Sequence, residues 1–240
     1  MSPPAAPSAA APSVARTVIR AEAVERTLPG VVPVRLVRGV SLSILSGEFV
    51  SIQGPSGSGK SSLLYLLGLL DVPTAGRIHL DGVDTSGFDE DDLAEVRLAK
   101  LGFVFQFHFL LGEFTALQNV MLPMEKLGRL APAARRERAL SLLFDLGLDG
   151  HETKRPDQLS GGQRQRVAIA RAMANDPIVI LADEPTGNLD RASSANVQEI
   201  LKRLTRERGT AVVAVTHDGD FARAGDRIVR IVDGRIEGEG

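Results

Sequence analysis

Three short apolar runs divide the chain, and each leads into a residue type that can take part in chemistry. Such runs, apolar on both faces and rich in β-branched residues, are typical of central strands in a parallel sheet covered by helices. Open α/β sheets bind their ligands at the carboxyl ends of these strands. The alternative is three core strands whose polar ends share no role. The runs are residues 49–53 before Gly54, 178–182 before Asp183, and 211–216 before His217.

Helical periodicity replaces the strand pattern between the first two runs. Apolar residues recur at positions i, i+3, i+4 and i+7, and Gly147 follows as a helix stop. We therefore expect a helical insertion over about residues 107–160 of an α/β core. The periodic positions are Ala139, Leu142, Leu143 and Leu146.

The two ends of the chain differ. Residues 1–15 consist almost entirely of Ala, Ser and Pro, which predicts a disordered arm without the basic start and apolar stretch of a secretory signal. Near the other end, residues 227–231 and 234–237 flank Asp233-Gly234, which predicts a β-hairpin.

Composition narrows the class of protein. The 240 residues carry 28 Lys and Arg against 30 Asp and Glu, so their balance gives no indication of a nucleic-acid partner. The absence of cysteine excludes disulfides and cysteine-ligated zinc. The longest strongly apolar stretch, residues 63–70, is far shorter than the roughly 20 residues that span a bilayer. We expect a soluble globular chain whose role at a membrane, if any, needs another chain.

A phosphate-binding loop follows the first apolar run. Its residues fit G-x-x-x-x-G-K-[ST], between a predicted strand and an apolar helix over residues 62–70. Glycines let backbone N–H groups converge on phosphate oxygens, the lysine reaches the β and γ phosphates, and the last serine hydroxyl can bind Mg²⁺. The alternative is a Gly/Ser turn with a chance lysine. The candidate nucleotide-binding residues are Gly54, Pro55, Ser56, Gly57, Ser58, Gly59, Lys60, Ser61 and, next in the chain, Ser62.

Candidate catalytic residues follow the second and third runs. Asp183 is a Walker-B-type residue that would hold Mg²⁺, and Glu184 is free to accept a proton from an attacking water. His217 is a candidate partner for the γ-phosphate or the water. The alternatives are a turn at a strand end and a surface histidine.

A second site that could bind an anion lies at the start of a predicted helix over residues 163–174. We call this site and the phosphate loop the two anion-type sites. Ser160 and Gln163 form an S-x-x-Q capping box, and two glycines between them cost about 1 kcal/mol each relative to alanine. Bare backbone at a helix amino end can bind an anion, although a flexible loop would also explain the glycines. The residues of this site are Ser160, Gly161, Gly162 and Gln163.

These motifs together resemble the ATPase subunits of ABC transporters. The phosphate loop, LSGGQ at residues 159–163, ILADEP at residues 180–185, Asn188-Leu189-Asp190 and His217 occur in that family's order. The resemblance implies an ABC ATPase domain over residues 16–240, with a RecA-like P-loop NTPase core, an antiparallel β subdomain and the helical insertion.

The resemblance also implies how the sites work. ATP would lie between the phosphate loop of one subunit and the LSGGQ of the other in a head-to-tail homodimer, where Ser160 and Gly162 act on the partner's γ-phosphate. Asp190 would link the two sites, and Gln106 would contact Mg²⁺ or its water. The dimer would power an integral-membrane permease from the cytoplasmic face of the membrane.

Residues 102–123 resemble the lipoprotein-release, macrolide-efflux and cell-division subfamily. Most of the phenylalanines around Gln106 are expected in the core, the alternative being a groove for a membrane partner. Two positions depart from the subfamily: Thr27 stands where an aromatic residue stacks on adenine, which predicts weak base selectivity, and Gln118 replaces a frequent Glu, which predicts altered partner contacts. The phenylalanines are Phe103, Phe105, Phe107, Phe109 and Phe114.

Two other functions compete. An ABC-type ATPase acting on DNA or ribosomes is disfavoured, because the chain has one cassette and no heptad array between its motifs. A non-catalytic subunit is disfavoured because Lys60, Glu184 and His217 are all present. The basic segments at residues 135–138 and 202–208 are expected to be solvated helix faces rather than binding patches.

Overall fold

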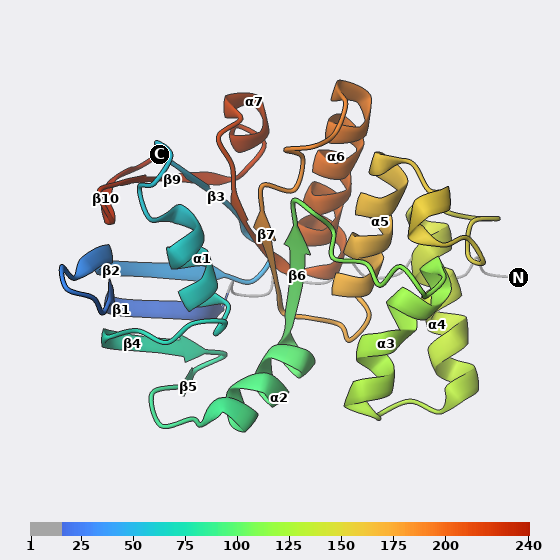
Figure 1. Cartoon of the computed structure of the whole chain (residues 1–240), viewed down its shortest axis with the longest axis horizontal. Coiled ribbons are helices and arrows are strands. Elements are labelled where there is room, and N and C mark those ends of the chain that lie inside the picture. The colour runs from blue at the N-terminus through green and yellow to red at the C-terminus, as the bar shows by residue number, and fades with distance from the viewer. Residues whose placement is uncertain (1–15) are drawn as a thin grey trace, which may run out of the picture.

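The computed structural model describes residues 16–240, so the predicted arm of residues 1–15 lies outside the described residues. A mainly parallel sheet of six strands crosses the middle of the molecule in the order β10-β9-β3-β8-β7-β6 (Figure 1). Within this sheet of the described residues, the β9–β10 pair alone is antiparallel, which confirms the predicted parallel sheet and the predicted hairpin. The strands are β3 (Phe49–Gln53), β6 (Leu101–Phe105), β7 (Val179–Asp183), β8 (Ala211–Val215), β9 (Arg227–Val232) and β10 (Arg235–Glu239).

A second, antiparallel sheet lies beside the first, in the order β2-β1-β4-β5. Its longest pair, β1 and β2, encloses an exposed loop that contains Val31 and Val32. Thr27, near the end of β1, pairs with Arg35 of β2. The strands are β1 (Thr17–Leu28), β2 (Val34–Leu45), β4 (Ala75–Leu80) and β5 (Val83–Asp84).

Helices cover both faces of the parallel sheet. Figure 1 shows α1 on one side of β7, and α5 and α6 on the other. The core is divided accordingly, since Leu181 packs with α1 residues and Ile180, next in the strand, with α5 and α6 residues. The helices are α1 (Lys60–Leu67), α2 (Glu90–Lys100), α3 (Ala116–Leu127), α4 (Pro132–Asp145), the 3-10 turn η1 (Pro156–Gln158), α5 (Gly161–Ala172), α6 (Arg191–Arg208) and α7 (Gly219–Ala222).

Local signals set the ends of the helices. The helix predicted from the periodic residues is α4, which begins with Pro132 in its first turn and ends before Gly147, a glycine with positive φ. The helices predicted over residues 62–70 and 163–174 each begin and end two or three residues earlier than expected. At the start of α3, the Gln118 side chain accepts from the Thr115 N–H in a capping box, a role that needs only a carbonyl oxygen.

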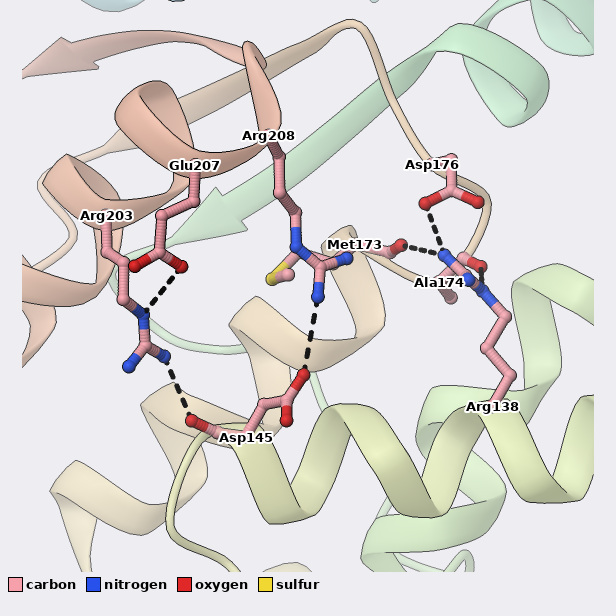
Figure 2. A network of polar contacts seen from close by, with 8 residues as sticks. All are labelled: Arg138, Asp145, Met173, Ala174, Asp176, Arg203, Glu207 and Arg208. Atoms are coloured by element: carbon pink, nitrogen blue, oxygen red, sulfur yellow. Dashed lines mark hydrogen bonds and ion pairs between the residues drawn. The ribbon is translucent and has the colours of Figure 1, made fainter. Parts of the chain in front are cut away.

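Arginines join α4 to α6 and to the loop before β7 (Figure 2). Arg208 pairs with Asp145 at 3.3 Å, and Arg203 donates to the Asp145 carbonyl at 3.0 Å. Arg138 donates to the carbonyl of Ala174 and pairs with Asp176. Arg208 is exposed, as expected for a solvated helix face, whereas Arg138 is partly buried because its guanidinium satisfies several acceptors at a helix–loop contact.

None of the helices between residues 16 and 240 combines the length and the apolar composition needed to cross a membrane.

Candidate functional site

The loop between β3 and α1 curls around its own lysine. Lys60 is buried, and its ammonium donates to the carbonyls of Gly54 at 3.0 Å and Pro55 at 2.7 Å. The buried Ser58 hydroxyl makes no hydrogen bond within the described part of the chain, while Pro55, Ser56 and Gly57 are exposed. An unpaired hydroxyl and a lysine that contacts only its own loop suit the binding of a phosphate group.

Two glycines of this loop allow close backbone contacts. A Cβ on Gly54 would lie 2.0 Å from the carbonyl oxygen of Ile231, and one on Gly59 would lie 2.2 Å from that of Leu36. Gly59 is also the N-cap of α1, with a φ of 97°. The loop is thus held between β2 and β9, and its shape requires residues without a side chain.

Asp183, at the end of β7, faces two hydroxyl groups of α1. The Ser61 Oγ lies 3.0 Å from Asp183 Oδ1, and the Tyr65 Oη lies 2.9 Å from Asp183 Oδ2. Burial and the hydrogen bond to Asp183 raise the pKa of Tyr65 to about 12, so Tyr65 is the donor. Hard oxygen donors beside a phosphate loop fit Mg²⁺, which is commonly bound by one or two carboxylates plus substrate phosphates.

Glu184 contacts His217 across neighbouring strands. The Glu184 Oε1 lies 2.9 Å from the His217 Nδ1, and Glu184 has a positive φ of 47°. A left-handed backbone is uncommon for glutamate, and a backbone bond from Glu184 N–H to the Val215 carbonyl at 3.0 Å accompanies it. His217 follows the end of β8 and has a largely exposed side chain. This carboxylate can accept a proton at the same sheet edge as Lys60.

Gln106 contacts the loop after β7 rather than the Ser61–Asp183 pair. Its side-chain amide donates to Asn188 Oδ1 at 3.2 Å, and a Cβ on Gly187 would lie 2.8 Å from the same amide. No hydrogen bond joins Gln106 to Ser61 or Asp183 in the described residues. The predicted contact of Gln106 with Mg²⁺ therefore stays a prediction.

The second anion-type site is built at the start of α5. Ser160 is the N-cap, and its hydroxyl and the Gln163 side chain form the predicted capping box. A Cβ on Gly162 would lie 2.6 Å from the Ser193 hydroxyl, so α6 approaches the glycine closely. Asp190 caps α6 and accepts from the Ser193 hydroxyl at 2.6 Å, and the Ser193 hydrogen bonds lower the pKa of Asp190.

The predicted site residues thus form two groups. Lys60, Ser61, Asp183, Glu184 and His217 lie at the carboxyl ends of the parallel strands, beside α1. The residues Ser160, Gly161, Gly162 and Gln163 lie at the start of α5, on the other side of β7 (Figure 1). One chain therefore carries two anion-type sites, which lie on opposite sides of β7.

Two of the phenylalanines around Gln106, Phe103 and Phe105, line an apolar groove, and Phe103 also packs against the core. Phe107 and Phe109 are 69% and 61% exposed, and none of the five predicted core phenylalanines is buried. The prediction of a mainly buried cluster was wrong, because aromatic side chains near the surface can pack against each other, as Phe105 and Phe109 do edge to face with ring centroids 5.3 Å apart. The cavity is about 500 Å³, and its apolar lining includes Leu98, Leu101, Phe103, Phe105, Leu122 and Pro123.

Sequence reasoning missed Arg171, which holds the loop after Gln106. Its guanidinium donates to the carbonyls of Phe109 at 2.6 Å and His108 at 2.7 Å, and both of these residues have positive φ. The arginine lies in the last turn of α5, so it connects the second anion-type helix with the exposed phenylalanines. A lone arginine in a helix gives no sequence signal for such a contact.

The ABC transporter family model matches residues 37–187, which include the phosphate loop, Asp183, Glu184 and the start of α5. The chain belongs to the ABC transporter family. It is similar to the lipoprotein-releasing system ATP-binding protein LolD of Aquifex aeolicus, with 48% identity over 92% of this chain and 97% of the relative. It is also 47% identical to the macrolide export ATP-binding/permease protein MacB of Syntrophobacter fumaroxidans, over 88% of this chain and 30% of that longer protein.

A solved structure of another ABC cassette has the same fold. The dimeric post-hydrolysis structure of the ATP-binding cassette MJ0796 from Methanocaldococcus jannaschii, bound to ADP and Pi, matches with a TM-score of 0.86. The identity is 45%, and the match covers 92% of this chain and 97% of that one. These ABC relatives confirm the predicted family and fold, and none of them supports the alternative of a DNA- or ribosome-acting ATPase.

Proposed function

We propose that the chain is the ATP-binding, ATP-hydrolysing subunit of an ABC transporter complex and works as a head-to-tail homodimer. The observation that carries the proposal is the separation of the two anion-type sites on either side of β7. A γ-phosphate bound at Lys60 can meet a Ser160 helix end only if a second copy supplies it. The dimeric MJ0796 structure supports this arrangement.

In the proposed reaction, water attacks the γ-phosphorus in line with the bond to the β-phosphate oxygen. A P–O bond to water forms, the bond to the leaving ADP oxygen breaks, and Glu184 accepts the proton from the water. Lys60 turns from its own loop carbonyls to the phosphate oxygens, and His217 holds the transferred group. Ser61 and Asp183 would hold Mg²⁺, which supplies charge neutralisation when bound.

The apolar groove supports the proposal that the chain binds a membrane partner. Its apolar lining, which includes Phe105, and the exposed Phe109 that packs against Phe105 suit the docking of an amphipathic helix from an integral-membrane permease. The names of the relatives support export or lipoprotein release as the process. With such a partner, the chain would lie on the cytoplasmic face of the membrane.

Phosphate release from ATP and from GTP, with and without Mg²⁺, tests the proposed activity. We expect Mg²⁺-dependent release that Glu184→Gln removes, and a small ratio between the two nucleotides because Thr27 offers no aromatic ring to the base. Wild-type protein that releases no phosphate would contradict the proposal.

A further inference from the structure

Tyr65 lies one helical turn after Ser61, so the two hydroxyl-bearing side chains point from the same face of α1. Both reach the carboxylate of Asp183, 118 residues or more further along the chain: Ser61 contacts Oδ1 at 3.0 Å and Tyr65 contacts Oδ2 at 2.9 Å. One helix thus holds both oxygens of one carboxylate. Tyr65 is the only tyrosine in the sequence.

The rest of Tyr65 is fixed in place. Its ring is half-buried and packs against the apolar cluster between α1 and the sheet. Its backbone carbonyl accepts from the N–H of Leu70 at 2.9 Å, in the turn that ends α1. Because the ring is held by packing, its hydroxyl can orient the group that it contacts. A hydroxyl on a mobile side chain would instead move with that group.

We propose that Tyr65 is a positioning residue for the cation site, holding the plane of the Asp183 carboxylate so that Oδ1 stays directed at Ser61. The proposal rests on the proposed function, because the cation is the Mg²⁺ that accompanies ATP. Without Tyr65, only the Ser61 hydrogen bond would hold the Asp183 carboxylate, because the preferences of its terminal torsion are broad and roughly two-fold. Tyr65 donates to Oδ2, so Oδ1 stays on the side of Ser61, the hydroxyl that would bind the cation together with it.

Loss of the hydroxyl therefore affects the cation more than the nucleotide. In Tyr65→Phe the ring and its packing remain, but Asp183 loses one hydrogen-bond donor. Loss of a group that orients a metal ligand typically costs 10- to 100-fold in metal affinity, so we expect about tenfold weaker binding of the cation. The phosphate loop keeps all its donors, so nucleotide affinity without a divalent cation changes less than about twofold.

Mn²⁺ binding tests this with a readout that is independent of hydrolysis. Free Mn²⁺ is measured by its electron paramagnetic resonance signal in titrations of full-length protein with ADP, and ADP affinity in EDTA is measured by calorimetry. Thr74→Val is the matched control, because it removes a hydroxyl that donates to the Glu25 carbonyl at an exposed position. We expect weaker Mn²⁺ binding for Tyr65→Phe alone, with unchanged ADP affinity in EDTA.

Equal Mn²⁺ affinity in the wild type and Tyr65→Phe would overturn the proposal, as would an equal loss of ADP affinity in EDTA. If Tyr65→Phe does not fold, wild-type affinity in a folded Tyr65→Leu variant would equally overturn the proposal. Phosphate release by the wild-type protein, measured in the same preparation, separates this outcome from failure of the proposed function.

Discussion

The Glu184 carboxylate contacts the His217 imidazole at 2.9 Å, where β7 and β8 end side by side. The two residues are 33 positions apart in sequence and meet because their strands are parallel neighbours. In this arrangement Glu184 can accept a proton from water, and His217 can hold both Glu184 and the transferred phosphoryl group.

Removal of either side chain should slow hydrolysis without loss of nucleotide binding. Glu184→Gln removes the proton acceptor, and we expect kcat to fall by about 100-fold or more. His217→Ala removes the group that we propose to stabilise the transferred phosphoryl, and we expect a loss of about 100-fold as well. Steady-state phosphate release with saturating ATP measures both. A Glu184→Gln protein with wild-type kcat would mean that another group accepts the proton from the attacking water.

The shape of the phosphate loop depends on glycine at position 59. In Gly59→Ala the new Cβ would meet the Leu36 carbonyl, so the loop must move and its N–H groups leave their positions. Strain of about 1–3 kcal/mol predicts at least roughly fivefold weaker ATP binding. Calorimetry measures the affinity. Gly87→Ala is the control, since a Cβ there has no neighbour within 4 Å, and equal affinities of the two variants would contradict the account.

Arg138 is expected to stabilise the contact between α4 and the loop before β7 (Figure 2). In Arg138→Ala the carbonyl of Ala174 loses its guanidinium donor, and the ion pair with Asp176 is lost. We expect the free energy of unfolding to fall by about 1–3 kcal/mol in urea denaturation. Arg136→Ala, at an exposed position of the same helix, should change it by less than about 0.5 kcal/mol. Equal effects would mean that the contacts of Arg138 add no stability.

The apolar groove can be tested apart from the catalytic site. Leu122→Asp places a charge in the groove and should reduce copurification with an integral-membrane protein from native membranes at least tenfold, while basal phosphate release stays near wild type. Leu130→Asp, at an exposed position outside the groove, is the control. Undiminished recovery of the membrane protein with Leu122→Asp would place the docking surface elsewhere.

Local sequence signals predicted the strands and the phosphate loop well. Apolar runs define β3, β7 and β8 because a strand covered on both faces must be apolar throughout. The phosphate-loop motif is a run of eight consecutive residues, so it was visible in the sequence, although the backbone contacts that require Gly54 and Gly59 come from β9 and β2. The capping box of Ser160 and Gln163 spans only four residues, so it too was visible in the sequence. Such features depend on neighbours in the chain.

Contacts across the fold could not be predicted. Whether Phe107 and Phe109 are buried depends on which elements cover the loop after β6, and none covers them in the described residues. The Tyr65–Asp183 contact depends on how α1 is rotated on the sheet, which tertiary packing sets. The same holds for Arg138, whose acceptors are carbonyls of a distant loop rather than a residue type with a recognisable pattern.

The central claim is that two copies of this chain complete each ATP site. Light scattering of Glu184→Gln protein with ATP and Mg²⁺ measures this directly, because ATP is bound but not hydrolysed. We expect a mass twice the 25.6 kDa of one chain, and a mass of 25.6 kDa for the double variant that carries Lys60→Ala as well as Glu184→Gln. A Glu184→Gln protein that binds ATP and still has the mass of one chain would contradict it.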